Sequence, residues 1–281
     1  MKKYSAYILL FWAFAQLFWL ASCKEDSMTN QTENSNELLN IITSRGSNIA
    51  STDGDITVIA IDYLYGGASS LDNFDISGYF KNSSGNGIAV SNFTVGNLSI
   101  PLKPNNHYSL HKGSVTPEDN ISQVASSFYG QDINYLVSSV DFGNISTTLN
   151  MSTALNTSIN SQTSTIINKS APLQINWQPD PYTGDGADDE LVGVVIVYHA
   201  GIPANQEQEG LPSQNITIYK QANDGAGSVT FTSQELSVFP ANSYVNIYSG
   251  RAHQKIVSSS TGKTVAITNL VLTTTLDMKI Q

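Results

Sequence analysis

Apolar and polar side chains alternate with a period of two along most of the chain, which is the pattern of half-buried β-strands. The alternation is clear from Phe74 to Phe80 and from Leu173 to Trp177. After the acidic loop, the apolar run VGVVIVY follows, with Val194, Ile196 and Tyr198 in register. At the end of the sequence, the even-numbered positions from Leu270 to Ile280 carry the larger apolar side chains, which predicts one half-buried strand with a polar outer face. No long stripe with helical spacing interrupts this pattern. The chain is therefore expected to be all-β.

Further strands are expected where β-branched and aromatic residues gather, at Asp55–Tyr65, Asn106–Leu110 and Ile133–Val137. In the stretch NFTVGNLSI, two short apolar runs flank Gly96 and Asn97. A two-residue loop of this kind predicts a tight hairpin.

The distribution of Asn, Ser and Thr suggests how the chain is divided. Residues 143–170 are nearly free of charge and rich in these three residue types, so a boundary is placed between residues 164 and 165. This gives a leader at 1–22, a polar flexible tether at 23–52, and two β-sandwich domains at 53–164 and 165–281. Within the tether, Glu37–Ile42 is expected to form one or two helical turns.

The amino terminus has the order of a secretory signal peptide, with two lysines followed by the apolar run Tyr4–Ala21. The run ends in Leu20-Ala21-Ser22-Cys23, which resembles the lipobox of bacterial lipoproteins. The resemblance implies cleavage between Ser22 and Cys23 and acylation of the Cys23 sulfur, and hence attachment to a membrane through a lipid anchor. The alternative is a transmembrane helix with a free thiol at its end, because about 17 apolar residues already suffice to cross a bilayer.

The residues after the cysteine refine the expected location. Lys24-Glu25-Asp26 resembles the export tag of surface-exposed lipoproteins of the Bacteroidetes type, which implies the outer membrane with the protein facing the extracellular side. A solvated run of charges is the alternative. Asp26-Ser27-Met28 resembles an O-glycosylation motif of the same bacteria, which implies a sugar on Ser27.

Two further resemblances concern the fold. The segment from Ile76 to Asn97 resembles the carboxypeptidase-regulatory type of β-sandwich. The order of Trp177, Pro240 and Tyr244 resembles the fibronectin type III outline, which implies a core tryptophan and a tyrosine hydroxyl that fixes a corner. Asn246 departs from that outline, which prefers an apolar residue there. The expected fold is therefore two Ig-like or fibronectin III-like β-sandwich domains.

Composition changes this picture in two ways. Cys23 is the only cysteine, so no disulfide can form and buried apolar surface must supply the stability. The formal net charge is −10, and without Lys2 and Lys3 the mature part carries 11 basic and 23 acidic residues. This balance argues against nucleic acid as a partner, because binding to phosphates needs clustered Lys and Arg.

The strongest candidate for chemistry is the acidic stretch DPYTGDGADDE. Its carboxylates belong to Asp180, Asp185, Asp188, Asp189 and Glu190. Oxygen-rich loops hold Ca²⁺, which takes six to eight oxygen ligands, although this spacing is not that of an EF-hand. A solvated acidic loop is the alternative, and no other cofactor is expected.

No catalytic residue is assigned, and the chain is not expected to be an enzyme. It contains neither Gly-x-Ser-x-Gly nor His-Glu-x-x-His. The pair His107 and His111 lacks further zinc ligands, and His199 and His253 are expected on the polar surface. A carboxylate pair assembled by the fold stays open as the route to a hydrolase.

The leading functional hypothesis is thus a non-enzymatic surface lipoprotein that serves as a binding, adhesion or structural module. The second hypothesis is a glycan-binding accessory of an outer-membrane nutrient importer. It depends on exposed tyrosines in the first half of the chain, since tyrosine rings stack on sugars. The tyrosines concerned are Tyr63, Tyr65, Tyr79, Tyr108, Tyr129 and Tyr135.

Overall fold

The computed structural model describes residues 52–65, 68–111, 127–160, 165–182 and 191–281. The largest sheet has nine strands, in the order β13-β12-β15-β16-β1-β2-β6-β5, with β10 beside the end of β16. Its strands are β1 (Gly54–Tyr65), β2 (Ala68–Phe80), β5 (Leu102–Lys103), β6 (His107–His111), β10 (Ile166–Ile167), β12 (Leu191–Tyr198), β13 (Ile216–Asn223), β15 (Tyr244–Ser258) and β16 (Thr264–Ile280).

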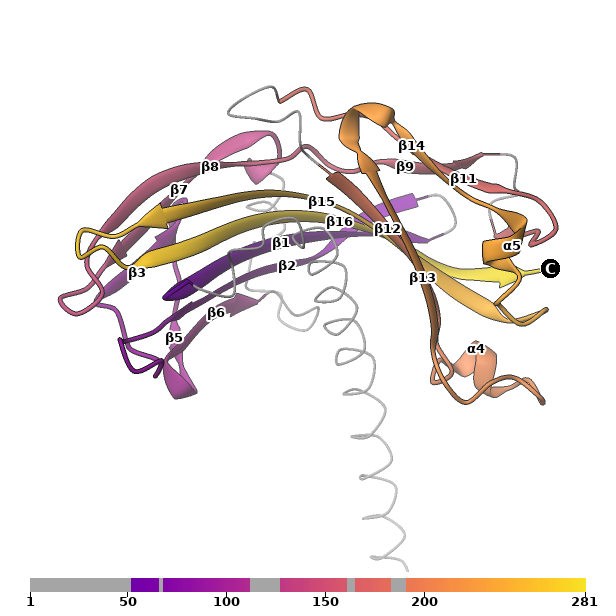
Figure 1. Ribbon diagram of the computed structural model, residues 1–281, viewed down its shortest axis with the longest axis horizontal. Helices are drawn as coiled ribbons and strands as arrows, with labels where there is room; N and C mark the ends of the chain where they lie inside the picture. The colour runs from indigo at the N-terminus through magenta and orange to yellow at the C-terminus, as the bar shows by residue number, and fades with distance from the viewer. Residues whose placement is uncertain (1–51, 66–67, 112–126, 161–164, 183–190) are drawn as a thin grey trace, which may run out of the picture.

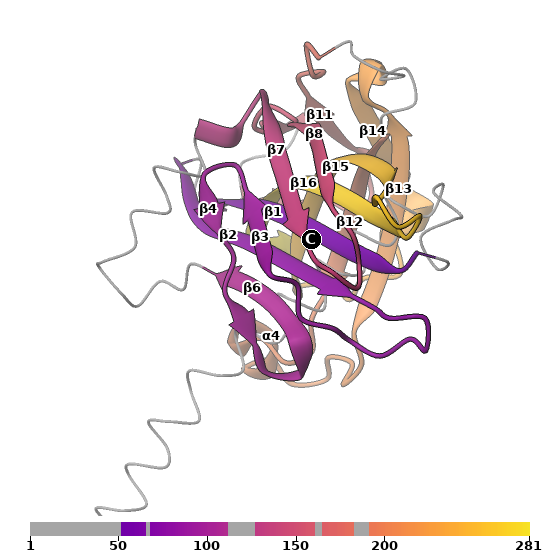
Figure 2. The ribbon, with the colours of Figure 1, turned by 90° about the vertical axis from the view of Figure 1, so that its left-hand side faces the viewer.

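Two smaller sheets pack on this large sheet. One has the order β4-β3-β7-β8 and the other β14-β11-β9. Their strands are β3 (Asn92–Val95), β4 (Leu98–Ser99), β7 (Gln131–Ser138), β8 (Ile145–Met151), β9 (Thr157–Asn160), β11 (Leu173–Trp177) and β14 (Ser228–Phe231). The smaller sheets lie at opposite ends of the long strands (Figure 1), and Figure 2 shows β3 and β7 at the near end with β12 and β13 behind them. The helical elements are short: η2 (Pro104–Asn106), α4 (Pro203–Gln206), η4 (Asp224–Ala226) and α5 (Ser233–Leu236).

The expectation of an all-β sandwich-type fold is confirmed. The expected strands are all present, and β3 and β4 form the hairpin at Gly96, whose φ of 57° places it where glycine is favoured. Phe74, Ile76 and Phe80 on β2 are buried on one face, as the alternation predicts.

The hairpin of β15 and β16 extends through both ends of the molecule. These strands have 15 and 17 residues, and β1 lies parallel to β16 from the pair Gly54–Val265 to the pair Leu64–Thr275. Strands from both sides of the boundary between residues 164 and 165 therefore share one sheet. The division into two domains at that boundary stays a prediction, and two units divided there would be joined along this sheet.

The strand at the end of the chain differs from its prediction. Every residue of β16 from Val265 to Thr274 is buried, so this half has no polar outer face. Leu270 and Leu272 lie in a different apolar cluster from Met278 and Ile280. The even-numbered side chains of β16 therefore change from one face of the sheet to the other. The cause is a β-bulge, in which β16 contains an extra residue opposite Val245–Ile247, and Asp277 in this bulge has a φ of 56°.

Asn246 stabilises this bulge. Its side-chain oxygen Oδ1 accepts a hydrogen bond from the backbone N–H of Asp277 at 3.1 Å. At the bulge, the backbone N–H of Asp277 has no carbonyl partner of the regular β-ladder. The side chain of Asn246 supplies the acceptor, which explains a polar residue at this buried position of β15.

The core of the first end is aromatic. Phe80 makes edge-to-face contacts with Phe93, Tyr108 and Phe142, with ring centroids 5.2 to 5.8 Å apart. The Tyr108 hydroxyl accepts a hydrogen bond from the N–H of Val90 at 2.7 Å and donates one to its carbonyl oxygen at 2.9 Å. This tyrosine thus closes the loop before β3 from inside the core.

The second end contains the residues of the fibronectin-like outline. Trp177 is buried in the core. The carbonyl oxygen of Pro240 accepts hydrogen bonds from the backbone and side chain of Ser243, while the backbone of Tyr244 pairs with the side chain of Asn205. Nearby, the Tyr198 hydroxyl donates to the Pro212 carbonyl oxygen at 2.7 Å, while the corner bond expected of Tyr244 stays a prediction.

Candidate functional site

The structure describes one of the five acids of the predicted calcium loop. Asp180 lies just after β11, whereas Asp185, Asp188, Asp189 and Glu190 fall outside the described residues. The signal-cleavage, lipidation, export and glycosylation positions from Ser22 to Ser27 also fall outside them. The geometry of the site is therefore built from Asp180 and its neighbours.

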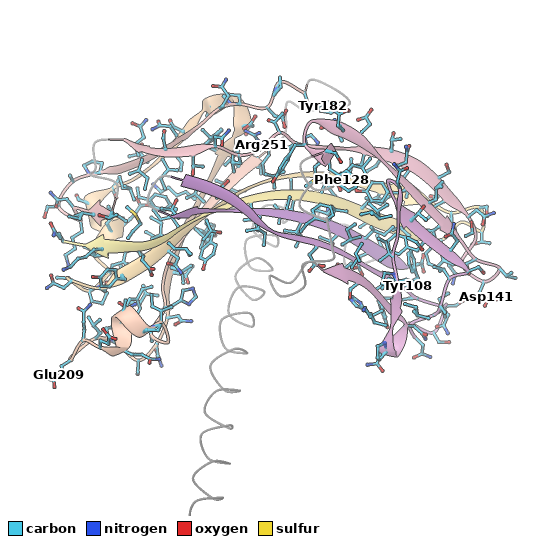
Figure 3. All side chains as sticks on the ribbon, turned by 180° about the vertical axis from the view of Figure 1, so that it is seen from behind. Tyr108, Phe128, Asp141, Tyr182, Glu209 and Arg251 are labelled. Carbon is cyan, nitrogen blue, oxygen red and sulfur yellow. The ribbon has the colours of Figure 1, made fainter. Side chains whose placement is uncertain are left out.

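Arg251 is the centre of this site. It lies on β15 between Val192 of β12 and Val271 of β16, and its side chain points to the face of the large sheet that carries the main core. Its exposed fraction is 0%, so the guanidinium is completely removed from water. Figure 3 shows it near the middle of the molecule, between the two ends. A buried charge in such a place must be compensated.

Hydrogen-bond acceptors surround the guanidinium group of Arg251 and compensate its buried charge. Nε and Nη2 donate to Oδ1 of Asp224 at 3.1 and 2.7 Å, and Nη2 also donates to the carbonyl oxygen of Gln178 at 2.6 Å. Nη1 donates to Oγ1 of Thr153 at 3.4 Å and to Oδ2 of Asp180 at 3.5 Å. These five interactions match the five N–H groups that an arginine carries, so none is left for a ligand.

Asp180 is likewise engaged. Its Oδ2 accepts from the backbone N–H of Thr153 at 2.9 Å, and its Oδ1 accepts from the N–H of Tyr182 at 3.1 Å. With a guanidinium beside it, this carboxylate is a poor ligand for a cation. Among the described residues, no group of three or more His, Cys, Asp or Glu side chains is arranged to hold a metal ion. A calcium site in the acidic loop stays a prediction, and it would have to use the other acids.

Asp224, in η4 directly after β13, connects the charges to the core. Its Oδ2 accepts from the backbone N–H of Asp180 at 2.5 Å, and its backbone carbonyl oxygen accepts from Nε1 of Trp177 at 2.9 Å. We call Arg251, Asp180, Asp224 and Thr153 the arginine node. It joins four segments that are distant in sequence, and it fixes the position from which the acidic loop departs.

A second buried polar group lies on the same hairpin. The Tyr135 hydroxyl donates to Oδ1 of Asn269, and Nδ2 of Asn269 donates to the carbonyl oxygens of Leu149 and Asn150 at 3.2 and 2.9 Å. Burial raises the pKa of the Tyr135 hydroxyl above its ordinary value, so it stays protonated and serves as a donor. This group holds β7 and β8 onto β16.

The chemistry open to the arginine node is limited. Glycoside hydrolysis needs two carboxyl groups on either side of a sugar, with space for it between them. Here Arg251 is bound to both Asp180 and Asp224, so the guanidinium occupies the position between them. These two acids are therefore a structural ion-pair network and not the carboxylate pair of the hydrolase hypothesis.

The histidines are distributed differently from the prediction. His107 is exposed on β6, as expected, and the side chain of His111 lies outside the description. His199 was expected at the surface but is buried beside α4, whose Asn205 donates to its carbonyl oxygen at 2.8 Å, and burial lowers its pKa. His253 is half-buried, with Nδ1 3.1 Å from the Asn150 carbonyl oxygen and its ring 5.3 Å from that of Tyr182.

The tyrosines of the glycan hypothesis do not form an exposed row in the described part of the chain. Tyr108 and Tyr135 are buried, and Tyr79 and Tyr129 are half-buried. Among the tyrosines whose side chains the structure describes, Tyr219 on β13, at the other end of the sheet, is strongly exposed.

Sequence reasoning missed the arginine node. Its signal was a single arginine between Gly250 and Ala252, directly after the apolar positions Val245, Ile247 and Tyr248 of the same strand. A lone charge in a buried strand requires partners. The partners themselves, Asp224 and Asp180, could not be identified from spacing, because they lie 27 and 71 positions away.

No protein-family model matches this sequence, and no curated protein matches it. Among solved structures, one similar chain comes from a study titled "Structural insight into host cell surface retention of a 1.5-MDa bacterial ice-binding adhesin", with a TM-score of 0.21 and 12% identity over 82% of this chain and 65% of that one. Another is a mutant Salmonella alpha-2-macroglobulin, with a TM-score of 0.21 and 13% identity over 79% of this chain and 15% of that one. This chain thus spans less than two thirds of either. Likenesses at this level carry no argument about function.

The described helices were also compared with the length and hydropathy that a membrane span requires. Within the five described ranges, no helix is long and apolar enough to cross a membrane.

Proposed function

We propose that this protein is a surface lipoprotein, anchored to the outer membrane through acylated Cys23, whose β-sandwich part serves as a non-enzymatic binding or structural module. The observation that carries the proposal is the sequence Leu20-Ala21-Ser22-Cys23 at the end of the apolar run Tyr4–Ala21. Several acyl chains on one cysteine give a stable anchor, because each buried methylene contributes about 0.8 kcal/mol.

The described fold is compatible with such a role. Strand β1 begins at Gly54, so the polar segment after Cys23 separates the anchor from this strand. The arginine node has no unused N–H donor, and its carboxylates are bound to the arginine, which favours a structural role over catalysis. Lys24-Glu25-Asp26 supports export to the outer face.

Mass spectrometry of the amino-terminal peptide tests the anchor. Protein from producing cells is expected to begin at Cys23 and to carry the added mass of acyl chains. The variant Cys23→Ser is expected to lack that mass and to keep residues 1–22. An unmodified thiol, or an uncleaved leader in the unaltered protein, would contradict the proposal.

Protease treatment of intact cells tests the outward orientation. The unaltered protein is expected to be degraded on intact cells, while a periplasmic marker stays protected. If the protein is degraded only after lysis, the anchor is retained in the proposal and the extracellular placement is wrong.

A further inference from the structure

The second face of the nine-stranded sheet carries a compact apolar patch. Its buried members come from the four central strands β12, β15, β16 and β1, and they are Val195, Val197, Tyr248, Leu270, Leu272 and Ile59. Their exposed fractions run from 0% for Leu270 to 9% for Ile59. The buried apolar residues of the two smaller sheets all belong to the other cluster. The smaller sheets therefore do not cover this patch, and another layer of the molecule must bury it.

Two neighbouring positions on this face of the sheet carry no side chain, and we call them the Gly193–Gly250 trough. Gly193 on β12 and Gly250 on β15 are direct register partners, and Gly250 in turn pairs with Leu272 on β16. Both glycines are buried. Glycine in the interior of a strand weakens the strand, and it marks positions where another backbone approaches closely. Two paired glycines beside Leu272 provide room for a chain segment to lie against the sheet.

The segments outside the described residues differ in what they offer. Residues 66–67 are two glycines, residues 161–164 are polar, and residues 183–190 carry four acids. In residues 112–126 the apolar side chains are scattered. Glu37–Ile42, by contrast, places four large aliphatic side chains within six positions, at Leu38, Leu39, Ile41 and Ile42. On a helical turn, positions 38, 41 and 42 share one face.

The connection to β1 allows this segment to reach the trough. Nine residues lie between Ile42 and Thr52, and the ten steps from one to the other span about 33 Å when extended. The patch begins at Ile59, about 17 Å along β1 from Gly54 at 3.3 Å per residue. The trough then lies about 14 Å away across the sheet, at three strand spacings of about 4.8 Å.

We propose that Glu37–Ile42 docks into the Gly193–Gly250 trough, so that the tether is attached to the sheet through its own aliphatic side chains. A segment of one or two turns is unstable as an isolated helix, and it gains its structure from packing. The consequence is a much shorter free tether: only residues 24–36 would remain between Cys23 and the docked segment. The docking itself does not depend on acylation.

Disulfide cross-linking tests the docking in the full chain. Cys23→Ser removes the native thiol, and Ala252→Cys places a thiol at the edge of the trough. Leu38→Cys, Leu39→Cys, Ile41→Cys and Ile42→Cys are then combined with it one at a time. At least one combination is expected to form an intramolecular disulfide in detergent solution. The control Val140→Cys lies at a fully exposed position at one end of the molecule, and it is expected to form none with the same tether cysteines.

Three outcomes would overturn the proposal. The first is the absence of a disulfide from all four combinations. The second is a disulfide-linked dimer through Ala252→Cys alone, which would show that a second copy covers the patch. The third is a cross-link from Phe14→Cys with none from residues 38–42, which would place the leader in the trough.

A second pair of variants separates docking from folding. Leu38→Asp combined with Ile42→Asp changes only the tether, so the sheets can still form. The aspartates are expected to abolish the cross-link from Leu39→Cys and to increase hydrogen exchange of the amides around Leu270 and Leu272. Asn36→Asp, just outside the aliphatic run, is the matched control and is expected to change neither. Unchanged exchange and cross-linking in the aspartate variant would contradict the docking.

Discussion

The two ends of the long hairpin are stabilised by different interactions. At the first end, Phe80, Phe93, Tyr108 and Phe142 fill the space between the sheets with aromatic rings. In the middle and toward the second end, the same space contains the arginine node. Apolar packing is non-directional and tolerates repacking, whereas a buried ion pair is stable only with all its partners in place. The node therefore specifies how the segments meet, while the aromatic end contributes mainly burial.

Removal of Arg251 is expected to have the largest effect. Arg251→Ala leaves Asp224 and Asp180 buried without their cation, and breaking a buried pair in this way costs about 3 to 5 kcal/mol. Denaturant unfolding of the purified protein measures the loss.

Two controls make this test specific. Arg251→Lys is also expected to destabilise, because an ammonium group cannot reach acceptors on several sides at once. Lys220→Ala, which breaks the partly exposed pair with Glu235, is expected to cost much less than Arg251→Ala, because solvent screens an exposed pair. Equal effects of Arg251→Ala and Lys220→Ala would show that the node is not the special feature of this region.

At the aromatic end, overpacking is expected to have a medium effect. A methyl group on Gly78 would lie 2.6 Å from the ring of Phe93, so Gly78→Ala forces that ring to move. Overpacking in a dense core costs about 1 to 3 kcal/mol. Combination with Phe93→Leu is expected to reduce the additional cost of the methyl group, and a double-mutant cycle measures this coupling. Strict additivity would contradict the contact.

The bulge in β16 offers a smaller test near the second end. Asn246→Ala removes the acceptor for the N–H of Asp277, and a net hydrogen bond contributes about 0.5 to 1.5 kcal/mol. The amide of Asp277 is also expected to exchange faster with solvent than in the unaltered protein. Unchanged exchange at this amide would show that the bulge does not need Asn246.

The smallest effect is expected from an exposed acid at the second end. The hydrogen bond from Lys220, together with those from Thr232, lowers the pKa of Glu235 from 4.5 to about 2. Because the folded-state pKa is the lower one, the stabilisation is present above pH 4.5 and is lost as the pH falls toward 2. Glu235→Gln is therefore expected to make acid unfolding in this window less steep. Glu209→Gln is an exposed control, and an identical change there would contradict the assignment.

Much of the fold was predictable from local patterns. Alternation predicted β2 and β11, the apolar run VGVVIVY predicted β12, and the glycine at position 96 predicted the hairpin of β3 and β4. The pattern at Leu270–Ile280 was misleading, because a bulge changed the face in the middle of the strand. A single inserted residue moves all later side chains to the opposite face of the sheet. The side-chain types of Thr275 to Asp277 did not predict this insertion.

The sequence by itself determined the secondary-structure type, because the period of apolar residues is a local property that each strand satisfies independently. It also contains the lipobox-like residues before Cys23, which need no fold to be recognised. The tertiary structure decided which strands are neighbours, and so it decided that β1 lies parallel to β16, that Arg251 meets Asp224 and Asp180, and that Gly193 faces Gly250. These contacts join residues far apart in the chain. They depend on the packing of all three sheets at once, which no local pattern encodes.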